Sequence, residues 1–104
     1  MDIDKAMHRL NELGEAWAEK KAAASLLEET KKTLASRLTV GSPGTSMAER
    51  ERNALADPEY IGHIEIMVEA RKEADKARVQ YDTAQQYLEL YKDKEATKRK
   101  EMGI

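Results

Sequence analysis

The side chains that could carry out chemistry are few and poorly arranged for it. The chain has no cysteine, so it has neither a thiol nucleophile nor a thiolate metal ligand. His8 and His63 fall on separate predicted helices and lack the Glu-x-x-His spacing of metal sites in helical bundles. We expect each histidine to be a half-exposed surface residue. We predict no catalytic, cofactor-binding or metal site, and no enzymatic activity.

A row of glutamates could also bind a metal ion. Glu65, Glu69 and Glu73 lie about one helical turn apart, as carboxylate ligands on one helix face would. Lys72 and Lys76 interleave with them at the spacing of ordinary surface ion pairs, each of which stabilises a helix by only ~0.2–0.5 kcal/mol. The row therefore predicts a solvated helix face.

A long helix is predicted over residues 3–39, and it carries His8. Apolar residues recur there three and four positions apart, which predicts one apolar seam along a helix. The carboxylates of Asp2 and Asp4 can accept hydrogen bonds from the free N–H groups at its start. The seam consists of Ile3, Ala6, Leu10, Leu13, Trp17, Ala24, Leu27, Leu34 and Leu38.

A connector over residues 40–46 and a short helix over residues 47–56 follow. Two glycines and Pro43 remove helical preference from the connector, and it lacks the spacing of a phosphate-binding loop. We expect it to be a turn or a hinge. Ser46 with Glu49 three residues later forms a capping box, which predicts the short helix.

A second long helix is predicted over residues 58–101. Asp57 is a good N-cap, and Pro58 is tolerated at the first helical position because its missing N–H would have no partner there. The apolar stripe of this helix consists of Tyr60, Ile64, Met67, Ala74, Tyr81, Ala84, Leu88 and Tyr91, and it is widened by Val68, Ala70 and Ala77.

These elements predict an all-α fold: a long antiparallel helical hairpin with a short connecting helix, forming a single domain over residues 1–104. A content of 37% charged and 5% aromatic residues is typical of long helices and coiled coils. We expect the core to be formed by Leu10, Leu13, Trp17, Leu27, Leu34, Ile64 and Leu88.

A single hairpin buries only one stripe of each helix. Apolar residues beside the second stripe should therefore stay partly uncovered, and we expect the hairpin to dimerise into a four-helix bundle or a coiled-coil-like oligomer. The residues expected to stay uncovered are Ile61, Ile66, Val79, Tyr87 and Leu90.

The formal charge of −2 gives no overall attraction to nucleic acid or to an anionic membrane. No stretch has the apolar run of a signal peptide or a membrane span. We therefore expect a cytoplasmic protein without a membrane partner.

Arg71 and Arg78 interrupt the second apolar stripe one heptad apart, and Lys20 and Lys31 interrupt the first seam. A buried unpaired cation is costly, so each must reach solvent or meet a carboxylate of a neighbouring helix. We interpret them as setting the register of a bundle. Alternatively, Arg71 and Arg78, together with Tyr81, bind an acidic partner or a phosphate backbone. The candidate carboxylates are Glu19, Glu28 and Glu69.

The segment 92–100 carries five cations against two acids, and three tyrosines lie upstream of it. Such a segment could contact nucleic acid, although cations also complement the dipole at a helix C-terminus. An alternative function is therefore a nucleic-acid accessory protein in recombination or replication. The cations are Lys92, Lys94, Lys98, Arg99 and Lys100.

One resemblance covers about half of the chain. The run Pro58-Glu59-Tyr60, followed by Val-Glu-Ala-Arg-Lys-Glu-Ala over residues 68–74, then Ala77-Arg78 and Tyr81, resembles small all-helical proteins of phages and prophages. The resemblance implies a phage-encoded protein in a bacterial host, with a role in recombination, host takeover or virion assembly.

A second resemblance is to the WXG100 secretion substrates, which are helical hairpins of about this length. Tyr91 and Glu95 match their Tyr-x-x-x-Asp/Glu signal. Their Trp-x-Gly turn has no counterpart, because Trp17 lies within the first helix and the turn begins Thr39-Val40-Gly41. This resemblance implies a secreted helical hairpin as a further alternative.

The function that we favour from the sequence is a non-enzymatic helical interaction protein. It would self-associate, preferably as a dimer, and bind an unidentified protein partner through apolar anchors beside Arg71 and Arg78.

Overall fold

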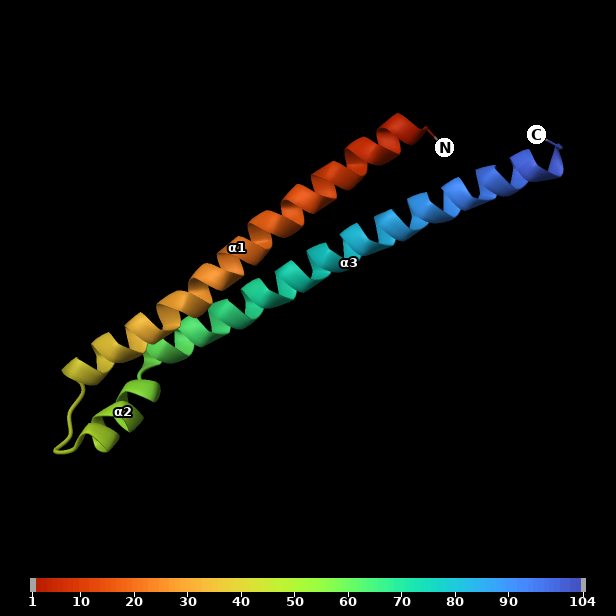
Figure 1. Ribbon diagram of the computed structural model, residues 1–104. Helices are drawn as coiled ribbons and strands as arrows, with labels where there is room; N and C mark the ends of the chain where they lie inside the picture. Colours follow the sequence, from red (N-terminus) through yellow and green to blue (C-terminus); the bar gives the residue numbers. More distant parts are fainter. Residues whose placement is uncertain (1, 104) are drawn as a thin grey trace. The chain divides into compact units, whose positions relative to one another are not determined.

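The computed structural model describes residues 2–103 (Figure 1). Three helices follow one another along the chain: α1 (Ile3–Gly41), α2 (Met47–Leu55) and α3 (Pro58–Glu101). No strand occurs within residues 2–103. The predicted all-α class is confirmed, as is the pair of long helices joined through a short one.

The starts of the long helices follow from local capping chemistry. The Asp2 carboxylate accepts hydrogen bonds from the main-chain N of Asp4 at 3.0 Å and of Lys5 at 3.3 Å. The Asp57 carboxylate accepts one from the main-chain N of Glu59 at 2.8 Å. Each bond satisfies an N–H that has no partner within the helix.

The short helix α2 starts with a modified capping box. The Ser46 hydroxyl accepts from the main-chain N of Glu49 at 3.2 Å, as expected. The Glu49 carboxylate, however, accepts from the main-chain N of Thr45 at 3.2 Å, whereas a standard capping box would have it accept from Ser46. The helix ends at Leu55, one residue before the predicted end.

The connector is shorter than predicted, because α1 continues to Gly41 and leaves residues 42–46 outside the helices. Asn53 Nδ2 donates to the Pro43 carbonyl at 2.7 Å, and Arg50 Nε donates to the Gly44 carbonyl at 3.1 Å. These bonds fasten the connector to α2. Gly44 has a φ of 145°, which other residues rarely adopt.

The packing divides the described residues into two compact units. Unit 1 comprises residues 2–18 of the N-terminal side and residues 75–103. In it Ile3 shares a hollow with Tyr91, and Gly14 lies against Tyr81, so the two helix segments run antiparallel.

Unit 2 comprises residues 19–74, which include most of α1, all of α2 and the start of α3. Ion pairs Lys20–Glu73 and Arg37–Glu59 show that its two long-helix segments are also antiparallel. The single domain predicted over residues 1–104 stays a prediction, because α1 and α3 each contribute to both units.

The core is thinner than the sequence suggested. Of the predicted core residues, Leu88 is buried, at 5% exposure, and the other six are only half-buried. Two helices alone cover only one side of most large side chains, and most of the buried side chains are therefore alanines. The buried apolar residues are Ala24, Ala54, Met67, Ala74, Ala77 and Leu88, and those that are half-buried although predicted for the core are Leu10, Leu13, Trp17, Leu27, Leu34 and Ile64.

Candidate interaction surface

The apolar residues beside the α3 stripe are exposed, as the sequence led us to expect. The exposed fraction of the residue is 65% for Tyr87, 61% for Ile66 and 56% for Val79. Ile61 and Leu90 are exposed as well. Each unit therefore presents apolar side chains to the surroundings.

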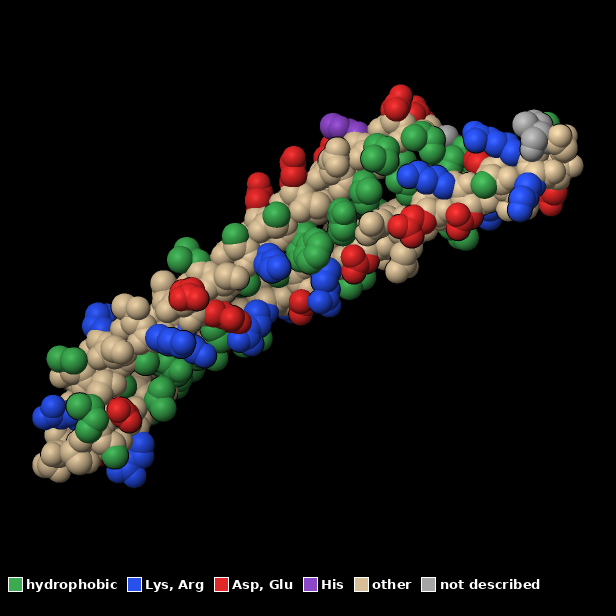
Figure 2. Space-filling view, in the orientation of Figure 1, with side chains coloured by type: hydrophobic (Ala, Val, Ile, Leu, Met, Phe, Trp, Pro, Cys, Tyr) green, Lys and Arg blue, Asp and Glu red, His purple; other side chains and the backbone are tan. Residues whose placement is uncertain are grey.

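In unit 1 the exposed residues border a groove of about 520 Å³ between α1 and α3. Ala6 and Leu13 line it from α1, and Val79, Ala84 and Tyr87 line it from α3. Figure 2 shows hydrophobic atoms along the junction of the two helices in this part of the molecule, with charged side chains beside them.

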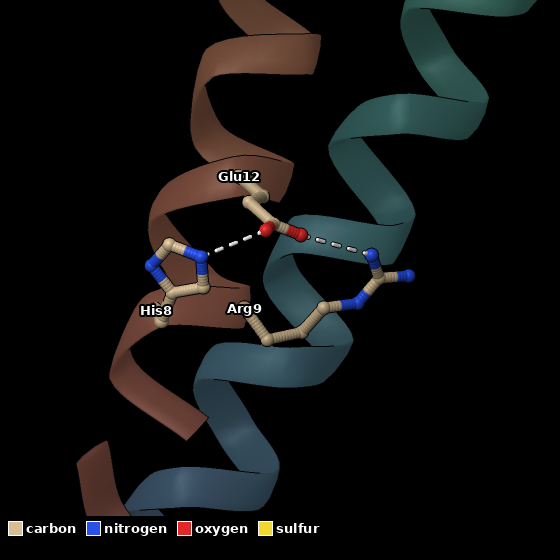
Figure 3. Close-up of polar contacts among 3 residues, drawn as sticks. All are labelled: His8, Arg9 and Glu12. Carbon is tan, nitrogen blue, oxygen red and sulfur yellow. Dashed lines mark hydrogen bonds and ion pairs between the residues drawn. The ribbon is translucent and has the colours of Figure 1, made fainter. Parts of the chain in front are cut away.

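Arg9 supplies a cation that lines this groove, and its charge is partly balanced on its own helix (Figure 3). Arg9 Nη1 lies 3.5 Å from one carboxylate oxygen of Glu12. His8 Nε2 lies 3.0 Å from the other oxygen, and the His8 side chain is 78% exposed. The three residues form an exposed polar cluster at the edge of the groove.

Tyr81, which we predicted to bind a partner, is packed within unit 1. Its ring centroid lies 5.6 Å from that of Trp17, with the planes inclined by 36°. A Cβ on Gly14 would lie 3.2 Å from Tyr81 Cε2, so the glycine allows the ring to approach α1 closely. Tyr81 is half-buried by these contacts and supports the helix pair from inside.

Of the other two predicted partner-binding residues, Arg71 forms an ion pair with Glu28 of α1, one of the three candidate carboxylates. Arg78 is exposed and has no ion-pair partner within residues 2–103. Lys20, which interrupts the first seam, lies 3.9 Å from Glu73. The cations within the apolar stripes thus reach solvent or carboxylates, and none is buried among the described residues.

His63 has the partial exposure that we expected, and it also contacts the neighbouring helix. It is half-buried in unit 2, and its Nε2 donates to the main-chain carbonyl of Leu27 at 2.7 Å. The sequence contains no signal for this contact, because an accepting carbonyl is present at every residue of α1.

Within residues 2–103, no three or more His, Asp or Glu side chains are grouped as metal ligands would be. No helix in that part of the chain combines the length and the apolar character that crossing a bilayer requires.

The cations of segment 92–100 are all exposed on α3. Lys98 Nζ lies 3.7 Å from a carboxylate oxygen of Glu95. In Figure 2, acidic side chains lie among the basic ones toward this end of α3, so the visible face has no continuous basic patch. Tyr91 and Glu95, the pair that matches the secretion signal, line a hollow together with Ile3.

Unit 2 has an apolar hollow that the sequence analysis missed. Val40, Met47 and Leu55 line a space of about 460 Å³ between α1 and α2. Val40 is 83% exposed. The apolar residues of the short helix indicated that one of its faces would be apolar. They did not indicate how α2 would pack against α1.

Comparison with known proteins finds no matching protein family, no similar curated protein and no similar solved structure.

Proposed function

We propose that this chain is a non-enzymatic helical interaction protein, which self-associates and presents its helical surface to a protein partner. The observation that carries the proposal is the row of exposed apolar residues on α3, of which Tyr87 and Ile66 are more than half exposed. Exposed apolar side chains that gather on one helix face, as Val79, Tyr87 and Leu90 do, mark sites of association with other proteins.

The thin core supports self-association. Four of the six apolar residues that are buried within residues 2–103 are alanines, so each unit gains little free energy from burial on its own. A dimer that forms a four-helix bundle covers apolar side chains that two helices leave exposed. Sedimentation velocity at micromolar concentration should give twice the chain mass of 11.8 kDa, and a mass of 11.8 kDa at all concentrations would refute self-association.

The partner surface of this proposal includes Arg71 and Arg78, with apolar residues beside them. Val68 is 52% exposed and lies three residues before Arg71. Reversing the charge of both arginines should disrupt assembly if they set the register of the bundle. If they bind an acidic partner instead, the double variant should assemble normally and lose that partner in a pull-down from the native host.

The setting that we propose is a phage programme in the cytoplasm of a bacterial host, and it rests on the resemblance of residues 58–81 to small phage and prophage proteins. Finding the gene beside phage replication or virion genes would support it, and finding it beside a secretion ATPase would favour the secreted hairpin instead.

A second candidate function, nucleic-acid binding, is favoured by the exposure of every cation in segment 92–100. Fluorescence anisotropy with a labelled oligonucleotide tests it. Binding should weaken steeply as salt rises and disappear when Lys98, Arg99 and Lys100 are changed to Gln. Binding that survives those changes would assign it to another surface.

A further inference from the structure

The stretch between Arg78 and Glu89 has an unusual composition for this chain. Asp82 is its only charged residue, whereas 37% of the whole chain is charged. The cores of protein interfaces are depleted in charge and enriched in tyrosine. The low charge of this stretch therefore points to a surface that another protein covers.

The same stretch supplies both a ridge and a hollow. Val79 and Tyr87 within it, and Leu90 directly after Glu89, are each more than half exposed, and the three extend over roughly 16 Å of helix. The groove beside them contains two small residues, Ala6 and Ala84, which leave room for a side chain from outside. A surface with a ridge and a hollow side by side can pack against a copy of itself.

The uncharged polar residues of the groove favour a second copy of this chain as the protein that binds there. Across a two-fold axis a residue near the axis meets its own counterpart. A charged residue would be repelled there, whereas the Thr83 hydroxyl has a donor and an acceptor and can pair with its own counterpart, and Gln80 and Tyr87 add no charge to the groove. A surface for an acidic or basic partner would instead carry an excess of the opposite charge.

Arg9, the cation that lines the groove, does not oppose this arrangement. Its guanidinium lies beside the Glu12 carboxylate of the same helix, so covering the groove does not enclose an unbalanced charge.

We infer that a second copy of this chain covers the groove of unit 1, in an antiparallel two-fold arrangement in which residues 79–90 of α3 from each copy pack on those of the other. Thr83 lies midway between Val79 and Tyr87, so the axis passes near Thr83 and each Val79 meets the partner's Tyr87. This inference rests on the proposed self-association and assigns it to one surface.

Sedimentation velocity of matched variants tests the assignment. Tyr87→Glu places a charge in the unit 1 surface, and Ile66→Glu places one at a comparably exposed position of unit 2, on the same helix. The dimer dissociation constant should rise at least tenfold for Tyr87→Glu and by less than threefold for Ile66→Glu. Circular dichroism checks that both variants keep the helix content of the wild type.

Other results would contradict the inference in distinct ways. If the wild type dimerises and Ile66→Glu dissociates while Tyr87→Glu does not, the dimer uses another surface and self-association stands. If the wild type is a monomer throughout, both self-association and this surface are refuted.

A cysteine crosslink gives a second readout that does not depend on weakening the protein. The chain has no cysteine, so Thr83→Cys and the control Ser25→Cys each introduce a single thiol at an exposed position. Mild oxidation should give a disulfide dimer with Thr83→Cys, because the two Cα atoms then lie within the roughly 4.4–6.8 Å that a disulfide spans. Equal or faster crosslinking of Ser25→Cys would overturn the placement of the axis.

Discussion

Unit 1 and unit 2 each pair a segment of α1 with a segment of α3, but different interactions hold the two segments together in each unit. In unit 2, ion pairs Arg71–Glu28 and Arg37–Glu59 join α1 to α3, and His63 donates to a main-chain carbonyl of α1. The short helix α2 also belongs to this unit.

In unit 1 the described ion pairs lie within single helices, as in Arg9–Glu12 and Lys98–Glu95. An aromatic contact, Trp17 with Tyr81, holds the two helix segments together, and a groove stays open beside it. Ion pairs therefore fix the register of α1 against α3 in unit 2. Unit 1 depends instead on apolar contacts, and its two helix segments leave part of their apolar surface exposed.

The largest effect is expected from Leu88→Ala, which removes a buried side chain from unit 1. The free energy of unfolding should fall by about 2–4 kcal/mol, because the helix pair cannot collapse around the space left behind. Urea denaturation at a fixed protein concentration measures it, since association adds to apparent stability. The control Leu26→Ala changes a residue that is 64% exposed and should shift the free energy by less than about 0.5 kcal/mol.

Substituting leucine for glycine at two positions sharpens the contrast between the units. Gly14→Leu inserts a side chain against the Tyr81 ring and should lower the unfolding free energy by about 1–3 kcal/mol. A Cβ added at Gly62 would have no atom within 4 Å. Gly62→Leu should therefore raise the unfolding free energy by up to about 1 kcal/mol, because leucine has a higher helix propensity than glycine. Equal effects in thermal or urea unfolding would argue against the Gly14–Tyr81 contact.

A substitution in the connector should change the unfolding free energy by a smaller amount. Gly44→Ala should destabilise the protein by about 1–2 kcal/mol, because the φ of 145° disfavours a side chain and the added Cβ would lie 3.1 Å from Glu49 Cγ. Gly41→Ala, at the end of α1 with open space around it, should be neutral or stabilising in the same urea assay. A neutral Gly44→Ala would mean that the connector adopts another conformation.

The smallest effect belongs to the interhelical ion pair of unit 2. Both side chains are about half exposed, so a double-mutant cycle of Arg71→Ala and Glu28→Ala should give a coupling energy of only about 0.2–1 kcal/mol. The stability lost by the double variant should be smaller than the sum of the two single losses by that amount. Arg78→Ala should show no coupling to Glu28→Ala.

Helix positions could be predicted from the sequence because their signals are local. Asp57 and Ser46 accept from main-chain N–H groups within three residues, and these bonds fix where α3 and α2 begin. The end of α1 was less predictable. Its last turn continues to Gly41, where the Ser42 hydroxyl donates to the Leu38 carbonyl at 2.6 Å.

The candidate surface could be predicted only in part. The seven-residue spacing of the stripe indicates that Val79 and Tyr87 face outward, and both are exposed. The spacing does not say which residues of α1 lie opposite those of α3. The contacts of Tyr81 with Gly14 and of Arg71 with Glu28 depend on that register, and so does the groove.

The most direct test of the central claim, that two copies meet through residues 79–90 of unit 1, is an NMR dilution series that follows backbone amide chemical shifts. We predict that the amides of residues 79–90 shift as the protein passes from monomer to dimer, while those of residues 60–74 keep their positions. Shifts confined to residues 60–74, or no shift in either segment, would contradict the account.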